Sequence, residues 1–242
     1  MRLTKLSLAC LVLGGSALLT ACGGGGGSSG GISLGGGSSL TLNGTAATGA
    51  PVVGAVSATC KSGTGTATSN LDGSFTVVVS GGVGPCLLSI TPAGGTPIYS
   101  ITSGSGATQT ANITPMTNLL VSYLRNVPGM TAADPAAWFA LPAVKTLLAD
   151  TTALTARIVN DFVPALKTLL PTLSVANAGF LFTPFVASPT GSTTDADLEK
   201  LKTANIVTST GAPSTTTTNS LKTAASNDTA VVTPTGATGA GS

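Results

Sequence analysis

The spacing of apolar residues changes along the chain, and its first part predicts a β-rich region. Between residues 40 and 113, apolar and β-branched residues alternate with polar ones in short runs separated by Gly, Asn, Asp or Pro. Alternation with a period of two is typical of half-buried strands. We therefore expect an antiparallel β-sandwich over residues 40–113. The expected strands lie within residues 40–42, 52–60, 74–80, 86–91, 98–102 and 108–113.

From residue 114 to residue 204 the apolar residues recur every three or four positions, which predicts helices. Thr114 can cap the first helix and Pro115 suits its first position. One face of this helix holds Met116, Leu119, Leu120, Tyr123 and Leu124. Further helices are expected after residues 134 and 142, around 154–162 and 166–173, and from Thr194, which is spaced from Asp197 as a capping box. The expected fold class is α+β, with a small helical segment after the sandwich.

The first 21 residues are typical of an export signal. Arg2 and Lys5 make the beginning of the chain basic, and residues 6–19 are mostly apolar. A membrane-spanning helix needs about 20 apolar residues, whereas the apolar part of a secretory signal is shorter. We therefore expect residues 1–21 to be removed on export.

Residues 19–22 read Leu-Thr-Ala-Cys and resemble the lipobox of bacterial lipoproteins. The resemblance implies that Cys22 becomes the first residue of the mature protein and carries lipid. A membrane is then an expected partner, because several acyl chains anchor a protein stably. Gly23 rather than Asp follows Cys22, which resembles sorting to the outer membrane, on its periplasmic or surface face. The alternative is an ordinary signal peptide beside an unrelated cysteine.

Two flanking regions have compositions that do not favour a packed core. Residues 22–39 are almost entirely Gly and Ser, which is typical of a flexible tether. A phosphate-binding loop would need a preceding strand and a following Gly-Lys-Ser/Thr, which this segment lacks. Residues 205–242 are dominated by Thr, Ser, Ala, Gly and Asn, so we expect a disordered tail.

Composition limits the chemistry that the chain can perform. Only 7% of the 242 residues are charged and none is His, which excludes Ser-His-Asp and Cys-His nucleophiles and histidine metal ligands. The formal charge of +2 becomes zero once Arg2 and Lys5 leave with the signal. A neutral chain does not favour nucleic acid as a partner. We expect neither a cofactor nor a metal.

Two motifs lie at expected turns of the β-rich region. Residues 49–56 read GAPVVGAV and residues 68–75 read TSNLDGSF. Together they resemble the carboxypeptidase regulatory-like domain, a transthyretin-like (prealbumin-like) β-sandwich. In the second motif, Gly73 is free to take a positive φ in a turn, and Phe75 then enters the core. Asp72 can cap that turn. A calcium ligand is the alternative role, but no Asp-x-Asp partner lies nearby.

The family resemblance implies a fold and a role, not an activity. The family's β-module is non-catalytic and accompanies other domains as a folding or recognition unit. The zinc ligands of a peptidase would include His, which this chain lacks. We therefore do not expect an enzyme. The leading hypothesis is a lipid-anchored cell-envelope module for binding, adhesion or assembly, with an envelope protein or glycan as partner. A purely structural envelope lipoprotein and a hydrolase that uses Asp or Glu are the alternatives.

Cys60 and Cys86 are the cysteines that remain once Cys10 has left with the signal and Cys22 is acylated. Both lie in expected strands of one exported region, so we expect a disulfide between them. Metal binding or a redox role would be favoured by a C-x-x-C spacing, which the sequence lacks.

Phe180, Phe182 and Phe185 are half of the six Phe residues in the chain. They could form an exposed patch that binds a glycan or peptide partner. In a chain with so few aromatic residues, the favoured interpretation is that they fill the core between the helices and the sandwich.

Asp195, Asp197 and Glu199 form the densest acidic group. One interpretation is a calcium site or a pair of catalytic carboxylates. The other is a set of acids near the start of a helix, where they favour the positive end of its dipole, balanced by Lys200 and Lys202. Residues 195 and 197 project about 200° apart on a helix, which favours the second interpretation.

Overall fold

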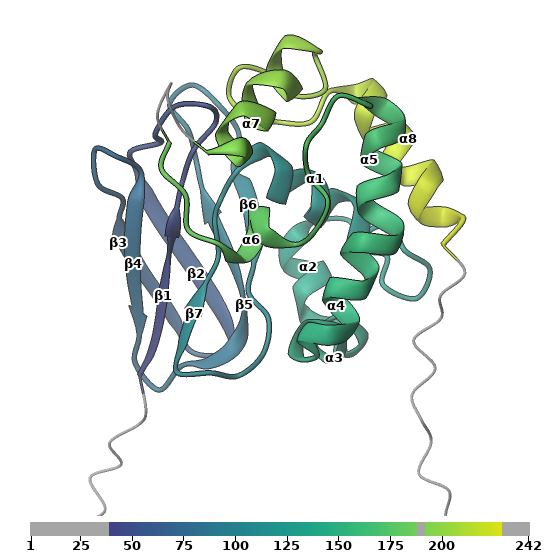
Figure 1. Cartoon of the computed structure of the whole chain (residues 1–242). Helices are drawn as coiled ribbons and strands as arrows, with labels where there is room; N and C mark the ends of the chain where they lie inside the picture. Colours follow the sequence, from purple (N-terminus) through teal and green to yellow (C-terminus); the bar gives the residue numbers. More distant parts are fainter. Residues whose placement is uncertain (1–38, 188–191, 229–242) are drawn as a thin grey trace, which may run out of the picture. The chain divides into compact units, whose positions relative to one another are not determined.

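The structure, a computed structural model, describes residues 39–187 and 192–228, which form a mixed α+β fold (Figure 1). The alternating region forms strands close to the expected positions, because alternation buries apolar side chains when every second residue faces a core. The strands are β1 (Leu40–Thr45), β2 (Ala55–Ser62), β3 (Thr64–Thr68), β4 (Ser74–Val79), β5 (Val83–Ile90), β6 (Ile98–Ile101) and β7 (Thr108–Thr110). The sequence does not predict β3 as a strand of its own, because TGTAT holds no large apolar residue.

The strands form two sheets, with the order β4-β1-β7 in the first and β3-β2-β5-β6 in the second. Neighbouring strands are antiparallel except β1 and β7, which run parallel and pair Thr41 with Thr108. The expectation of an entirely antiparallel arrangement is therefore wrong for this pair. A parallel neighbour requires a long connection, and here the chain passes through the whole second sheet before it returns beside β1.

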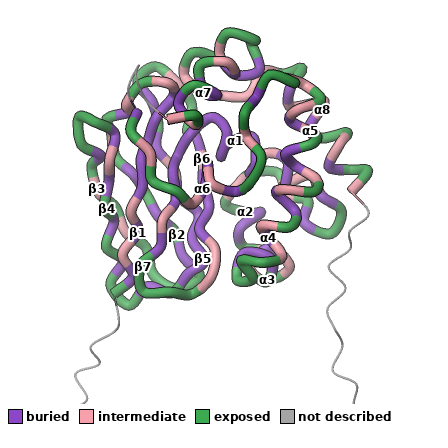
Figure 2. The backbone as a smooth tube through the Cα atoms, in the orientation of Figure 1, coloured by how far each residue is buried: buried purple, intermediate pink, exposed green. Residues whose placement is uncertain are grey.

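One apolar core lies between the two sheets. Alternate residues of the strands face it, and Figure 2 shows them as buried stretches that alternate with exposed ones along β2 and β4. The first sheet contributes Leu40, Leu42, Val77 and Val79, and the second contributes Val56, Ala58, Leu88, Ile90 and Ile98. Each of these side chains leaves water on folding, and the burial stabilises the fold by about 25 cal/mol per Å² of apolar surface.

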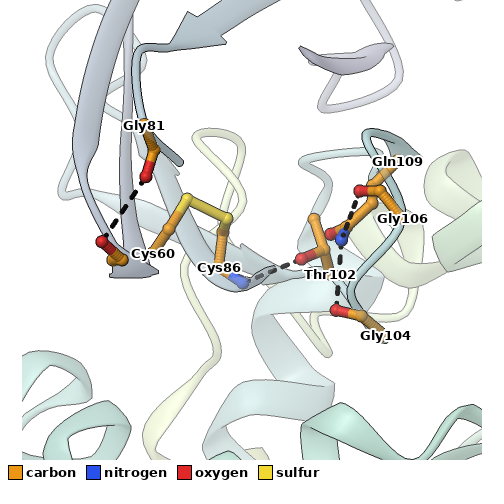
Figure 3. Close-up of a disulfide and its surroundings, with 8 residues drawn as sticks. Cys60, Gly81, Cys86, Thr102, Gly104, Gly106 and Gln109 are labelled. Carbon is orange, nitrogen blue, oxygen red and sulfur yellow. Dashed lines mark hydrogen bonds between the residues drawn. A yellow bond between two sulfur atoms is a disulfide. The ribbon is translucent and has the colours of Figure 1, made fainter. Parts of the chain in front are cut away.

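The predicted disulfide is confirmed: Cys60 and Cys86 are bonded across β2 and β5 (Figure 3). The two residues are directly opposite each other in the register of the antiparallel pair, and both are buried in the core between the sheets. The N–H of Cys86 also donates a hydrogen bond of 2.8 Å to Oγ1 of Thr102.

The turn before β4 has the geometry that its sequence predicts. Gly73 has φ +81°, and its N–H donates to the carbonyl oxygen of Asn70 at 2.9 Å. A Cβ at Gly73 would lie 2.4 Å from the carbonyl oxygen of Ala46, so only glycine fits. Oδ1 of Asp72 accepts from the N–H of Ser74 at 2.9 Å and caps the turn. Phe75 follows and is buried in the core between the sheets.

The second region is helical, as its period predicts. Its elements are α1 (Pro115–Leu124), α2 (Pro135–Ala140), α3 (Pro142–Ala149), α4 (Thr151–Arg157), the π-helix η1 (Ile158–Phe162), α5 (Val163–Leu169), α6 (Gly179–Phe182), α7 (Thr193–Thr203) and α8 (Thr215–Ser226). The predicted cap of α1 is confirmed: Thr114 and Thr117 form a reciprocal capping box. The predicted cap of α7 is wrong. Ser192 is its N-cap, because the helix begins one residue before Thr194.

The helices pack around a second core, which includes Trp138, Tyr123 and Phe162. Leu87 of β5 and Ile101 of β6 belong to this core, so the outer face of the second sheet is covered by helices there. Polar contacts add to this joint. The N–H of Tyr99 donates to Asn118 at 3.1 Å, and Oγ1 of Thr117 donates to the carbonyl oxygen of Tyr99 at 2.9 Å.

The expectation of a disordered tail from residue 205 is wrong for residues 205–228. This stretch contains a β-bridge between Val207 and Pro213, followed by α8. The stretch places Ile206, Val207, Leu221 and Ala225 in the helical core, where all four are buried. Tertiary packing therefore orders a segment whose composition alone favours disorder.

Several predicted features lie outside the described residues. These are the export signal 1–21, the lipidation site Cys22, the tether up to residue 38 and the last part of the predicted tail, 229–242. Among the described residues, no helix has the length and apolar character required to cross a membrane.

Candidate functional site

A short irregular segment after α6, residues 183–186, passes between the helices and the end of β1. We call it the wall segment. Oγ1 of Thr45 donates to the carbonyl oxygen of Phe185 at 2.7 Å. Because Thr45 is the last residue of β1, this bond fixes the middle of the wall segment to the first sheet.

Asn112 holds the beginning of the wall segment. Its side chain is fully buried, and its Nδ2 donates to the carbonyl oxygens of Phe180 at 3.1 Å and Thr183 at 2.7 Å. Its Oδ1 accepts from the N–H of Thr45 at 3.1 Å, and its own N–H donates to the carbonyl oxygen of Leu181 at 3.0 Å. One amide side chain thus joins β1 to α6 and to the segment that follows.

The wall segment has a cavity on each side. The helix-side cavity has a volume of about 300 Å³ and is lined by Met116, Phe180, Phe185, Thr193 and Asp197 among others. The sheet-side groove has a volume of about 340 Å³ and is lined by Asn43, Asp72, Ser74, Thr76, Phe185 and Val186 among others. Phe185 lines both. Volumes of this size are at the lower end of those that hold small ligands.

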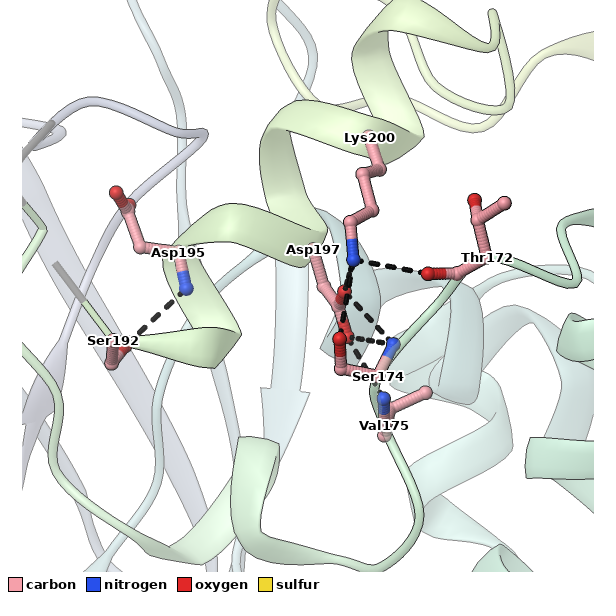
Figure 4. Close-up of polar contacts among 7 residues, drawn as sticks. All are labelled: Thr172, Ser174, Val175, Ser192, Asp195, Asp197 and Lys200. Carbon is pink, nitrogen blue, oxygen red and sulfur yellow. Dashed lines mark hydrogen bonds and ion pairs between the residues drawn. The ribbon is translucent and has the colours of Figure 1, made fainter. Parts of the chain in front are cut away.

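The carboxylate of Asp197 in the helix-side cavity is occupied by the protein itself. It accepts from the N–H of Ser174 at 2.9 and 3.0 Å, from the N–H of Val175 at 2.9 Å and from Nζ of Lys200 at 2.8 Å (Figure 4). A buried charge with these partners is compensated. Asp197 therefore joins α7 to the chain after α5, and both of its carboxylate oxygens are already used by the protein.

The acidic group of α7 does not form one site. Asp195 points away from Asp197, on the other side of the helix (Figure 4). It is only 3% exposed, and its Oδ1 has no hydrogen-bond partner among the described residues. Burial, and then the nearby charge of Glu199, raise the pKa of Asp195, while Lys202 acts in the opposite direction. Glu199 pairs with Lys202 at 3.1 Å. The arrangement agrees with the interpretation as helix-start acids balanced by lysines.

The sheet-side groove is polar and preorganised. Oδ1 of Asn43 accepts from Oγ1 of Thr76 at 2.9 Å, across the pair of strands β1 and β4. Oδ1 of Asp72 accepts from the N–H and Oγ of Ser74 at 2.9 and 2.7 Å. These bonds lower the pKa of Asp72, so the carboxylate stays ionised. Val186 is 66% exposed at the rim of the groove.

The three predicted patch residues are not exposed together. Phe180 is 4% exposed and lies in the helical core, with its ring 6.0 Å from that of Phe162. Phe182 and Phe185 are half-buried against the same core. The three rings therefore do not form an exposed patch. Phe180 fills the helical core instead. Phe185 differs because it also reaches the two cavities.

A buried polar cluster lies elsewhere, between α1, η1 and the end of α8. Arg157 forms an ion pair with Asp228, and their side chains are 6% and 3% exposed. Arg157 also lies 3.9 Å from Asp161, and the hydroxyl of Tyr123 donates to Asp228 at 3.3 Å. Burial, and then the charge of Asp228, raise the pKa values of Tyr123 and Asp161. These contacts join the end of α8 to α1, to η1 and to the end of α4.

The residues that build the site carry only weak sequence signals. Asn43 occupies an outward position in an alternating strand, so its place on the sheet face could have been inferred. Thr45 and Asn112 act through partners 140 and about 70 residues away, and no local pattern marks them. Within residues 39–187 and 192–228, no group of three or more Cys, Asp or Glu residues is placed to hold a metal ion.

Comparison of the chain with models of protein families, with curated proteins and with solved structures gave no match in any of the three.

Proposed function

We propose that the protein is an exported, non-catalytic lipoprotein of the cell envelope, anchored through Cys22, whose folded part is a binding or assembly module. In this proposal the two sheets form a transthyretin-like sandwich of the carboxypeptidase regulatory-like type. The arrangement of three- and four-stranded sheets around one core supports this assignment. So does the turn at Gly73, where the second motif directs Phe75 inward.

The observation that carries the proposal is the disulfide between Cys60 and Cys86. Disulfides persist in oxidising compartments and are rare where cellular thiols are kept reduced. A protein folded around this bond is expected outside the cytoplasm. The basic and apolar start of the sequence and the Leu-Thr-Ala-Cys motif at residues 19–22 independently point to the same destination.

A binding role is supported by the two cavities beside the wall segment, since each combines polar groups with an aromatic ring. The hydrogen bonds among the described residues that line the sheet-side groove leave a fixed set of donors and acceptors at its surface. A surface of this kind is suited to holding a ligand in one orientation.

Metabolic labelling with palmitate tests the anchor. The wild-type chain and a Cys10→Ala variant should both incorporate label and fractionate with the outer membrane. Cys22→Ala should lose the label and remain unanchored. Label retained in Cys22→Ala, or no label in the wild type, would overturn the anchor. Non-reducing mass spectrometry of the same material should show a peptide linking Cys60 and Cys86, and two alkylatable thiols would contradict export.

A further inference from the structure

The outer face of the first sheet has an unusual composition. Its outward positions are occupied by hydroxyl, amide and methyl groups, and none of them is charged. In register across the three strands, Thr41 lies between Val78 and Thr108, and Asn43 lies between Thr76 and Thr110. Strand spacing places these side chains about 5 Å apart across the sheet and about 7 Å apart along it. The face is therefore a regular neutral surface.

The sheet-side groove lies at the end of this face where β1 ends and β4 begins, and the wall segment lines it on one side. Its one ionised group is Asp72, whose Oδ2 has no hydrogen-bond partner among the described residues. The same holds for Nδ2 of Asn43, because Thr76 uses only its Oδ1. The groove thus presents a carboxylate acceptor and an amide donor whose orientations are already fixed by bonds to Ser74 and Thr76. Phe185 and Val186 supply an apolar side.

The groups in the groove disfavour some classes of ligand and suit others. No Lys or Arg lines the groove, and the carboxylate repels anions, so phosphate and carboxylate ligands are disfavoured. A purely apolar ligand would leave Asp72 and Asn43 desolvated without partners. The hydroxyls of a sugar, each of which is both donor and acceptor, suit a groove that offers both an acceptor and a donor. The C–H face of a sugar ring matches Phe185 and Val186.

A peptide fits less well. Extended peptides are usually recognised through the main-chain groups of a sheet edge, whereas the groove opens on the side chains of Asn43 and Thr76 in the face of the sheet. We propose that the sheet-side groove binds an uncharged carbohydrate chain. This inference deepens the proposed function, since it rests on the folded part being a binding module and names what that module holds.

The test uses the full chain with Cys22→Ala, exported so that the disulfide forms. Linear neutral hexasaccharides of glucose, mannose and N-acetylglucosamine are the probes, and hexagalacturonate and an unstructured hexapeptide are the comparisons. Saturation-transfer NMR at millimolar ligand detects weak binding, and calorimetry gives affinities. We expect at least one neutral hexasaccharide to bind, and hexagalacturonate to bind at least 10-fold more weakly.

Variants then locate the binding. Asp72→Asn and Asn43→Ala should each weaken binding of the neutral sugar at least 10-fold. Asp72→Asn keeps an oxygen that can cap the turn, so the fold is preserved. The matched control is Thr66→Ala, which removes an exposed hydroxyl from β3 of the other sheet and should leave binding unchanged.

Three results would overturn the inference: no transfer to any neutral probe, binding that survives both groove variants, or preference for the acidic sugar or the peptide. The outcome is separate from that of the lipid anchor. Sugar binding without palmitate label would support the sugar site and contradict the lipid anchor. Palmitate label without sugar binding would contradict only the sugar site.

Discussion

Thr45 and Phe185 are 140 residues apart in sequence, yet the hydroxyl of one donates a 2.7 Å hydrogen bond to the carbonyl oxygen of the other. The bond lies at the boundary between the sheets and the helical segment. Both cavities of the candidate site border Phe185, so their shape depends on this joint. The candidate site thus lies where the β-rich region meets the helical region. Hydrogen bonds between uncharged groups, rather than ion pairs, join the two regions there.

Replacement of Thr45 by Val tests the joint, because it keeps the shape of the side chain and removes the donor. The carbonyl oxygen of Phe185 then loses its partner in a part-buried position. We expect the free energy of unfolding to fall by about 1–2 kcal/mol, measured by urea denaturation. Thr66→Val on the exposed face of β3 is the control and should change stability by less than about 0.5 kcal/mol. Equal effects of the two replacements would show that the Thr45 bond does not hold the wall segment.

Asn112→Ala should have a larger effect, since it removes three side-chain hydrogen bonds from a fully buried position. The N–H of Thr45 and two carbonyl oxygens lose their partner. We expect a loss of about 2–4 kcal/mol in the free energy of unfolding. Hydrogen exchange should increase in α6 and at Thr45. Asn219→Ala, at an exposed position of α8, is the control. A loss below 1 kcal/mol for Asn112→Ala would contradict the role given to this residue.

The parts of the fold that local patterns determine are the parts that the sequence predicts. Thr114 caps α1 and Asp134 caps α2 because their side chains bond to the N–H groups just ahead of them. The alternation in β2 and β4 predicts which side chains are buried. The pairing of Cys60 with Cys86 could be predicted because the other two cysteines lie in the expected signal and lipidation motif.

Features that depend on distant partners escape such reasoning. The start of α8 reads TTTT, and Thr has low helix propensity, so the segment is helical because Leu221 and Ala225 enter the helical core. The parallel pairing of β7 with β1 depends on where the chain returns after the second sheet. The place of Phe185 beside two cavities depends on Thr45 and Asn112, whose partners lie far away in sequence.

Loss of the disulfide should destabilise the fold without changing its topology. The bond spans 26 residues, and closure of a loop of this length contributes about 3.5 kcal/mol in the chain-entropy model. We expect the Cys60→Ala, Cys86→Ala double variant to unfold at lower urea concentration by an amount equivalent to about 3–4 kcal/mol. Reduction of the wild type under denaturing conditions, followed by refolding in excess reductant, should give a similar loss. Identical midpoints for wild type and double variant would contradict a stabilising bond.

Asp195 should make stability depend on pH. Its pKa is raised by burial and by Glu199, so the folded state binds its proton more tightly than the unfolded state does. Its contribution to stability is therefore fully present below the ordinary value of 3.8 and is lost as the pH rises through the raised value of the folded state. Asp195→Asn removes this dependence. The variant's free energy of unfolding, relative to wild type, should increase between pH 4 and pH 7 in urea titrations. Parallel curves over that range would show that Asp195 does not titrate differently on folding.

The ion pair of Arg157 and Asp228 should decide whether α8 stays docked. Both side chains are almost fully buried, and Asp228 lies two residues after the end of the helix at Ser226. Asp228→Ala removes this ion pair, while the contact between Arg157 and Asp161 at 3.9 Å remains. We expect a loss of about 3 kcal/mol in the free energy of unfolding, which is the order of magnitude for removal of one partner from a buried ion pair. Hydrogen exchange in α8 should accelerate more than in α2. The double variant Arg157→Met, Asp228→Leu should recover most of the loss, because an apolar pair of similar volume carries no buried charge. If the single and double variants were equally unstable, packing of α8 rather than charge would hold the end of the chain.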